Sequence, residues 1–129
     1  MNFSFGKEER LCSRRLIESL YSDGHRLMAF PYSVQWRLEP LAVPCQVLVV
    51  APKRKFRHAV DRNRIKRLTR ECWRLRKHTL YQYLAEHNLS ITLALVYVHN
   101  EEFACEPLGR KMDKLVEALM ADIEKHRQP

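Results

Sequence analysis

The spacing of apolar residues predicts a small β-sheet. Residues 32–38 alternate between apolar and polar side chains, which is the period of a strand with one buried face. Residues 46–51 and 91–98 are more continuously apolar, and 91–98 is rich in the branched side chains that favour strands. Pro52 ends the run at 46–51. We therefore expect two or three strands in the first half of the chain and one more after the middle.

Helical periodicity flanks these strands. Residues 7–21 place apolar side chains on one face and stop at the breaker Ser22, Asp23 and Gly24. Another helix is predicted from Pro107 onwards, because proline is common in the first turn of a helix. Its apolar stripe consists of Met112, Leu115, Val116, Leu119, Met120 and Ile123. With one more helix in the middle, this order predicts the α+β class and a single domain.

The central helix, predicted at 59–77, separates apolar from basic side chains clearly. At 100° per residue, Leu68, Cys72 and Leu75 fall within about 80° of Ile65. The opposite side collects Asn63, Lys66, Arg67, Arg70, Arg74 and Lys77. We expect the apolar stripe to pack on the core and the basic side to face solvent.

Positive charge is concentrated in the same part of the chain. The 129 residues carry a formal net charge of +8, from 23 Lys and Arg against 15 Asp and Glu. Residues 53–78 contain 12 basic and 2 acidic side chains, whereas the preceding residues have a net charge of +1 and the following ones −3. Repulsion among these like charges lowers the stability of the folded protein, and no structural role that offsets this cost is evident. A face that binds a polyanion is therefore the first hypothesis.

Several classes of protein fit the sequence poorly. No apolar run approaches the ~18 residues of a membrane span, and the first residues lack the apolar segment of a secretion signal. The cysteines occur singly, at Cys12, Cys45, Cys72 and Cys105, without the paired spacing of a zinc site. We expect them to be reduced and mostly buried, and we expect the protein to be cytoplasmic.

The residues show no pattern of a catalytic or metal site. HExxH and DxD motifs are absent, and the histidines are scattered. Asp61 and Glu71 lie isolated among cations, where ion pairs are their more natural role. We therefore predict no catalytic side chain and no metal ligand in the protein.

The basic helix carries a recognisable motif. The run AVDRNRIKRLTRECWRLRK at 59–77, with PKRKF at 52–56, closely resembles the signature of the bacterial ribonuclease P protein subunit. The centre of the motif is the triplet Arg62, Asn63 and Arg64, followed by Ile65, Lys66 and Arg67. The resemblance extends more weakly over residues 6–123 and implies a single domain at 1–129 with its core at about 6–125.

The resemblance implies a fold and an activity. The family has a small four-stranded sheet in the order αβββαβα, a ribosomal protein S5 domain 2-like fold with a left-handed crossover at the basic helix. Its members assist a large catalytic RNA that removes the 5′ leader from precursor tRNA by hydrolysing a phosphodiester bond. The RNA and its Mg²⁺ ions perform the chemistry. We therefore expect a monomeric protein, one per RNA, that binds no cofactor alone and contacts both the RNA subunit and the leader.

The resemblance also implies site residues. The residues expected to bind RNA are Lys53, Arg54, Arg62, Asn63, Arg64, Lys66, Arg67, Arg70 and Arg74. In the leader-binding cleft the family usually has two phenylalanines four residues apart, where this chain has Ile17 and Tyr21. Tyr32 and Trp36 share one face of a predicted strand, so they form either an aromatic platform in that cleft or part of the core.

Three other functions share some of these sequence features. A self-sufficient nuclease needs an acid/base or metal cluster, which the sequence lacks. A helix-turn-helix DNA-binding protein needs a helix just before residue 59, where residues 46–52 read as a strand. A ribosomal or other structural RNA-binding protein would need the same basic side. Only the RNRIKR run and the preceding PKRKF separate it from the ribonuclease P assignment.

Overall fold

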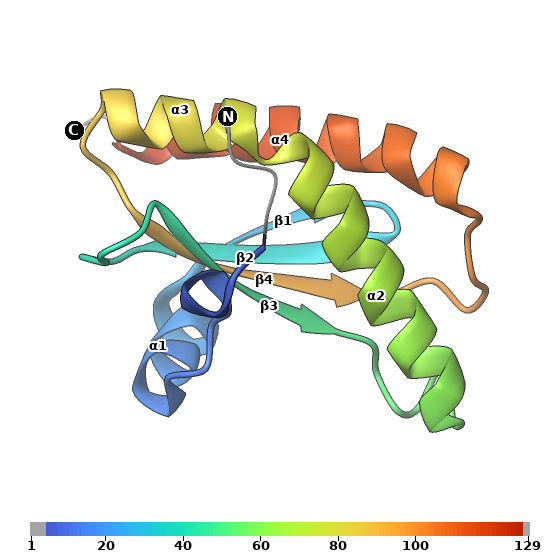
Figure 1. Ribbon diagram of the computed structural model, residues 1–129. Coiled ribbons are helices and arrows are strands. Elements are labelled where there is room, and N and C mark those ends of the chain that lie inside the picture. Colours follow the sequence, from blue (N-terminus) through green and yellow to red (C-terminus); the bar gives the residue numbers. More distant parts are fainter. Residues whose placement is uncertain (1–4, 128–129) are drawn as a thin grey trace.

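The computed structural model describes residues 5–127 (Figure 1). Its elements, in chain order, are η1 (Lys7–Glu9), α1 (Arg14–Asp23), β1 (His25–Ala29), β2 (Tyr32–Leu38), β3 (Cys45–Val50), α2 (Ala59–Arg76), α3 (His78–Glu86), β4 (Ile91–Tyr97) and α4 (Cys105–Arg127). The α+β class is confirmed, with a single four-stranded sheet in the order β1-β2-β4-β3. The pairs β1/β2 and β2/β4 are antiparallel, and β3/β4 is parallel.

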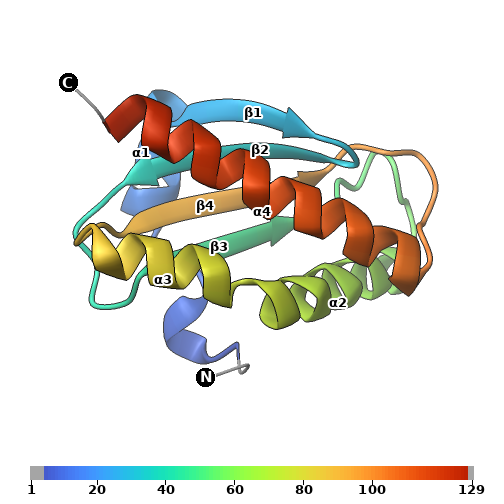
Figure 2. The same ribbon diagram turned by 90° about the horizontal axis from the view of Figure 1, so that it is seen from above.

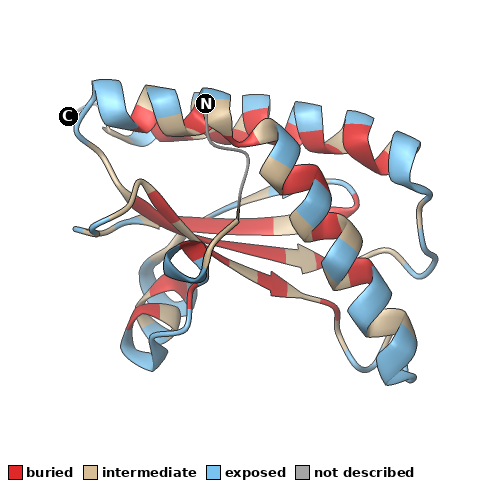
Figure 3. Ribbon diagram, viewed as in Figure 1, coloured by how far each residue is buried: buried red, intermediate tan, exposed pale blue. Residues whose placement is uncertain are grey.

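Helices cover the sheet unequally. In Figure 1, α3 and α4 lie above the sheet, α2 descends across the β3 edge, and α1 lies below. Side chains of β2 follow this division, because Tyr32, Val34 and Trp36 point to the helix layer and are fully buried. Figure 3 shows the buried residues along the inner sides of the helices. The β4 strand, which lies between β2 and β3, is buried along most of its length.

The connection from β3 to β4 is a crossover through α2 and α3. In Figure 2, seen from the helix side, both strands run from left to right, α2 and α3 lie nearer the viewer, and β4 lies above β3. This path is left-handed, against the strong right-handed preference of such units. The expected left-handed crossover is therefore confirmed.

Two elements escaped prediction from the residue pattern. The β1 strand is a short edge strand with the mixed sequence HRLMA, and its burial depends on α4 rather than on strong alternation. The α3 helix follows α2 directly, because Lys77 between them keeps helical backbone angles. The helix predicted at 7–21 also divides into η1 and α1, and Ser13 caps α1 by accepting a hydrogen bond from the Leu16 N–H at 3.3 Å.

The apolar side of α2 differs from the predicted stripe. Ile65 and Cys72 are buried as expected, but Leu75 is 45% exposed. Thr69 and Trp73 are buried instead. The Thr69 hydroxyl can enter the core because it shares a hydrogen bond of 2.6 Å with the Tyr32 hydroxyl.

The cysteines are only partly buried. All four are free thiols, with Cys45 and Cys72 buried and Cys12 and Cys105 exposed. The expectation of mostly buried cysteines therefore holds for two of them. Burial raises the pKa of the Cys45 and Cys72 thiols, which keeps them protonated.

A buried ion pair ties the N-terminal segment to the junction of α2 and α3. Lys77, predicted on the basic side of the central helix, is instead 2% exposed, and its Nζ lies 2.5 Å from Glu9 Oε1. The Tyr81 hydroxyl donates to the same oxygen at 2.6 Å, and Glu9 Oε2 accepts from the Gly6 N–H at 3.1 Å. Burial alone would raise the pKa of Glu9, but these hydrogen bonds outweigh it and the net pKa is lowered.

Replacing Lys77 by Met should lower the free energy of unfolding by about 3 to 5 kcal/mol at pH 7, because the Glu9 carboxylate stays buried without its cation. Urea unfolding of both proteins measures the difference. Because the pKa of folded Glu9 lies below its ordinary value of 4.5, the stabilisation by this pair is present above pH 4.5 and is lost as the pH falls through the lowered value.

The control is the double variant Lys77→Met/Glu9→Gln, which removes both charges and should recover much of the lost stability. Equal stability of Lys77→Met and the wild type would show that the pair contributes nothing to the fold.

Candidate nucleic-acid interface

The α2 helix presents a row of polar and basic side chains away from the core. We call Asn63, Lys66, Arg67, Arg70 and Arg74 the α2 ridge. Asn63 and Arg67 are exposed, and the other three are half-buried along their stems. The ridge follows the 3–4 residue spacing of one helix side, opposite Ile65 and Cys72, which anchor α2 in the core. The predicted separation of basic and apolar sides is confirmed for these residues, but not for Lys77, which is buried, or for Leu75, which is exposed.

Most of the ridge is electrostatically uncompensated. Within residues 5–127, no side-chain hydrogen bond or ion pair is found for Asn63, Lys66, Arg67 or Arg70. The same holds for Lys53 and Arg54, which lie exposed in the loop that leads from β3 into α2. Cations without carboxylate partners are available to an external anion.

Arg10 adds a cation that the sequence pattern did not reveal. It follows η1, is exposed, and pairs by its backbone with Val47 of β3. Partial burial, together with repulsion from Arg10, lowers the pKa of the Arg70 guanidinium. Two guanidinium groups that repel each other form a favourable place for a phosphate. No local signal could have found Arg10, since only the pairing of the N-terminal segment with β3 brings it near α2.

Two arginines of the central triplet, Arg62 and Arg64, bind backbone or carboxylate groups of the protein itself. Arg62 Nη1 donates to the carbonyl oxygens of Phe56 at 2.8 Å and Arg57 at 2.9 Å, and so fixes the loop before α2. Arg64 pairs with Glu102 at 3.0 Å. These two side chains therefore position the start of α2.

Arg74, at the other end of the ridge, is also paired. Its Nε donates to Glu71 Oε2 at 3.2 Å, one turn away, and this hydrogen bond lowers the pKa of the Glu71 carboxyl. The prediction that Glu71 forms an ion pair is confirmed. Arg74 is thus less available to an external anion than Arg67 or Arg70.

The predicted cleft residues divide between the two sides of the sheet. Tyr21 on α1 is 43% exposed, and the partly buried Ile17 packs against the cluster formed by Leu11, Leu16, Leu20 and Ala94. These residues lie on the α1 side of the sheet. Tyr21 offers an accessible ring, whereas Ile17 offers an aliphatic contact.

The prediction of an aromatic platform at Tyr32 and Trp36 is wrong. Both are 0% exposed and point to the helix layer, opposite α1. The Tyr32 hydroxyl is bonded to Thr69, and Trp36 Nε1 donates to Asp122 Oδ2 at 2.8 Å. Their shared strand face was inferred correctly, but that face is the core.

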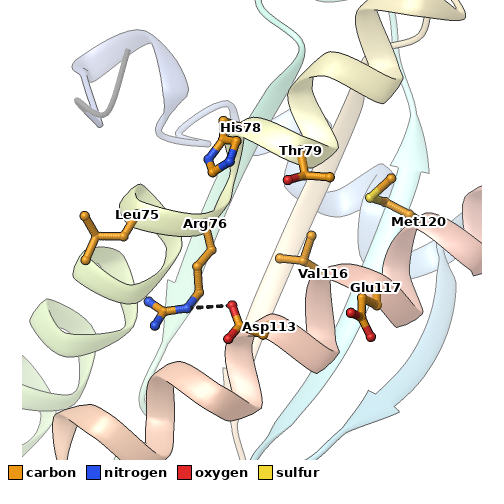
Figure 4. Close-up of a pocket in the computed structure, with 8 residues that line it drawn as sticks. All are labelled: Leu75, Arg76, His78, Thr79, Asp113, Val116, Glu117 and Met120. Carbon is orange, nitrogen blue, oxygen red and sulfur yellow. Dashed lines mark hydrogen bonds and ion pairs between the residues drawn. The ribbon is translucent and has the colours of Figure 1, made fainter. Parts of the chain in front are cut away.

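A hollow of about 590 Å³ lies away from the ridge, between α4 and the junction of α2 and α3 (Figure 4). The Arg76–Asp113 ion pair of 2.8 Å crosses it, and apolar side chains such as Leu75, Val116 and Met120 form part of its wall. Glu117 adds a negative charge. This hollow therefore suits a polyanion less well than the α2 ridge does.

The described part of the chain shows neither a metal-binding cluster nor a membrane-spanning helix. Among residues 5–127, no group of three or more His, Cys, Asp or Glu side chains is placed to hold a metal ion. None of the helices there is both long and apolar enough to cross a membrane.

Comparison with known proteins decides the family. The family model described as Ribonuclease P matches residues 5–119. The chain belongs to the ribonuclease P protein family. A ribonuclease P protein component from Porphyromonas gingivalis is 38% identical over 114 residues, which cover 87% of this chain and 83% of the relative. Another from Aliivibrio salmonicida is 35% identical over 80 residues, 62% of this chain and 68% of the relative.

Solved structures of ribonuclease P proteins share the fold. The RNase P protein of Staphylococcus aureus superposes with a TM-score of 0.69 at 16% identity, over 86% of this chain and 94% of that one. The RNase P protein of Thermotoga maritima gives a TM-score of 0.66 at 19% identity, over 85% and 96%. The chain is thus a protein subunit of ribonuclease P and acts in tRNA processing within a ribonucleoprotein.

The Arg67→Ala variant should bind ribonuclease P RNA more weakly than the wild type, because it removes an uncompensated charge from the ridge. The dependence of log K on log[salt] should become shallower by about 0.7 to 0.9 if one phosphate contact is lost. Binding measured at several salt concentrations gives both quantities. The Lys125→Ala control removes one positive charge from the exposed end of α4, outside the ridge, and should change neither quantity.

Proposed function

We propose that the α2 ridge and the loop before it bind the catalytic RNA of ribonuclease P, and that the α1 side of the sheet holds the 5′ leader of precursor tRNA. The observation that carries this proposal is a concentration of cations on α2 and the loop before it that have no carboxylate partner in the described chain, namely Lys53, Arg54, Lys66, Arg67 and Arg70. Family membership supplies the RNA partner.

The geometry of the ridge suits an RNA backbone. From Asn63 to Arg74 it extends about 16 Å, from 11 residues at about 1.5 Å rise each, so it can meet several phosphates. Arg67 and Arg70 offer planar forks for phosphate oxygens, and Lys66 offers a mobile point charge. Asn63 both donates and accepts, so it can contact a base edge or a 2′-hydroxyl.

The chemistry is proposed to belong to the RNA. Mg²⁺ bound with the RNA subunit would supply metal-ion catalysis, as the family resemblance implies. The protein would supply binding energy and charge neutralisation, as a monomer with one copy per RNA. We also propose the cytoplasm as its compartment, where the four free thiols stay reduced.

Leader binding is proposed on different grounds. Tyr21 presents an accessible ring on α1, and base–aromatic stacking tolerates any base sequence. Ile17 lies one helical turn earlier and would add an apolar contact without a π-face. Tyr32 and Trp36 have no part in the proposed cleft. A structural RNA-binding protein such as a ribosomal protein, the alternative considered from sequence, is not favoured by the family assignment.

Adding the protein to ribonuclease P RNA at low Mg²⁺ should increase cleavage of precursor tRNA, because the ridge reduces repulsion between phosphates that Mg²⁺ otherwise screens. Single-turnover cleavage with and without the protein measures the effect. Protein alone should leave the precursor intact. Cleavage by protein alone would overturn the assignment of chemistry to the RNA.

The Tyr21→Ala variant should weaken binding of precursor tRNA to the assembled enzyme by about 5- to 150-fold, the loss of one stacked base at ~1 to 3 kcal/mol. Binding of leaderless tRNA should stay unchanged. Tyr21→Phe is the matched control, since it keeps the ring and should bind like the wild type. Equal losses for both tRNA ligands would remove Tyr21 from the leader-binding surface.

A further inference from the structure

A second aromatic and cationic surface lies at the β1–β2 turn, on the helix side of the sheet. We call Phe30, His99, Phe103, Lys111 and Lys114 the Phe30 patch. Among the described Phe, Tyr and Trp residues, Phe30 has the most exposed side chain, at 49%. A half-exposed phenylalanine forgoes part of the free energy of burial, and a ligand that stacks on its ring would recover it.

Aromatic rings and an ammonium group are packed together in this patch. The ring centroids of His99 and Phe103 lie 5.1 Å apart in a stacked arrangement, and Phe30 meets both edge-on at 5.0 and 5.9 Å. Lys111 Nζ lies 5.3 Å from the Phe30 centroid and 5.4 Å from the Phe103 centroid. Rings with a cation beside them are the groups that bind a base and its phosphate together.

Next to these rings is a hollow that is open to solvent. It measures about 320 Å³ and is lined by Met28, Ala29, Phe30, Lys111, Lys114 and Ala118. Within residues 5–127, neither Lys111 nor Lys114 has a carboxylate partner, whereas the neighbouring Arg110 is paired with Glu106. The hollow therefore combines an apolar wall with two positive charges that are available to bind an anion.

The backbone around the patch is held in place by hydrogen bonds. The Tyr97 hydroxyl donates to the carbonyl oxygen of Glu101 at 2.6 Å and accepts from the Phe103 N–H at 3.2 Å. The Val98 N–H donates to the carbonyl oxygen of Pro31 at 2.8 Å. These bonds fix the β4–α4 loop against the β1–β2 turn. A stacking base would thus meet a site that is already formed.

The same loop connects the patch to the start of α2. Lys55 Nζ donates to Asn100 Oδ1 at 3.0 Å, and Arg64 pairs with Glu102. Phe103 follows Glu102 directly. The patch is therefore continuous with the α2 side of the molecule, whereas Tyr21 and the proposed leader surface lie across the sheet on the α1 side.

We propose that the Phe30 patch binds an unpaired nucleotide of the ribonuclease P RNA, with its base stacked on Phe30 and its phosphate beside Lys111 and Lys114. This inference rests on the proposed function in one respect, that the adjoining α2 ridge faces the same RNA. It adds a contact on a different layer of the fold, with a different chemistry.

The test compares binding of the full chain and its variants to transcribed ribonuclease P RNA. Phe30→Ala should weaken binding by about 5- to 150-fold without changing the salt dependence, because it removes a stack and no charge. Lys114→Ala should instead make the salt dependence shallower by about 0.7 to 0.9. Leu38→Ala is the matched control, since Leu38 is 40% exposed at the opposite end of β2, outside the patch, and carries no ring. It should bind like the wild type.

A second variant keeps the proposal testable if Phe30→Ala is poorly folded. Phe30→Trp retains a π-face and should keep wild-type affinity, and its new indole fluorescence should be quenched by the RNA. The native Trp36 and Trp73 are fully buried, so the unsubstituted protein provides the fluorescence baseline.

Four results would overturn the proposal. If Phe30→Ala binds the RNA like the wild type while Arg67→Ala binds more weakly, the patch does not contact the RNA and the proposed function is retained. If both variants bind like the wild type, the proposed function is discarded as well. A defect of Phe30→Ala confined to precursor tRNA binding by the assembled enzyme would assign the patch to the substrate. A change in self-association of the free protein, measured by light scattering, would make it a protein interface.

Discussion

The packing of α2 through Ile65, Cys72 and Trp73 is the constraint on which the rest of the structure depends. A helix that carries uncompensated positive charge along one side repels itself, and burial of its opposite side offsets that cost. The core contacts run to β3 and to α4, so the ridge stands at the edge of the sheet and faces outward. Because the crossover places α2 and α3 on the same face as α4, the α1 side of the sheet stays free for a separate surface.

The cations of the central segment divide into two groups with different tasks. Arg62, Arg64 and Lys77 bind backbone or carboxylate groups of the protein, and they fix the two ends of α2. Lys66, Arg67 and Arg70 lack such partners in the described chain. The first group orients the helix and the second presents charge to the RNA. A count of basic residues cannot separate the cations that are paired within the protein from those that are not, because both groups lie in the same run of sequence at 53–78.

Much of this architecture follows from local pattern, and the rest depends on tertiary contacts. The alternation at 32–38 and the helical period at 59–77 predicted β2 and α2 correctly, because each has one face in the core. Periodicity could not show which side of β2 is covered, so it left a cleft and the core as alternatives for Tyr32 and Trp36, and the structure places both in the core. It also missed Arg10, Lys77 and the Phe30 patch, since their environments are built by residues far apart in the chain.

Chemical footprinting of lysines in the complex with ribonuclease P RNA tests the central claim most directly. Acetylation of free and RNA-bound protein, followed by mass spectrometry, reports each amine separately. The account predicts that Lys53 and Lys66 become protected by RNA, that buried Lys77 reacts poorly in both states, and that Lys125 reacts equally in both. Unchanged reactivity of Lys53 and Lys66 in a saturated complex would contradict an RNA-facing α2 ridge.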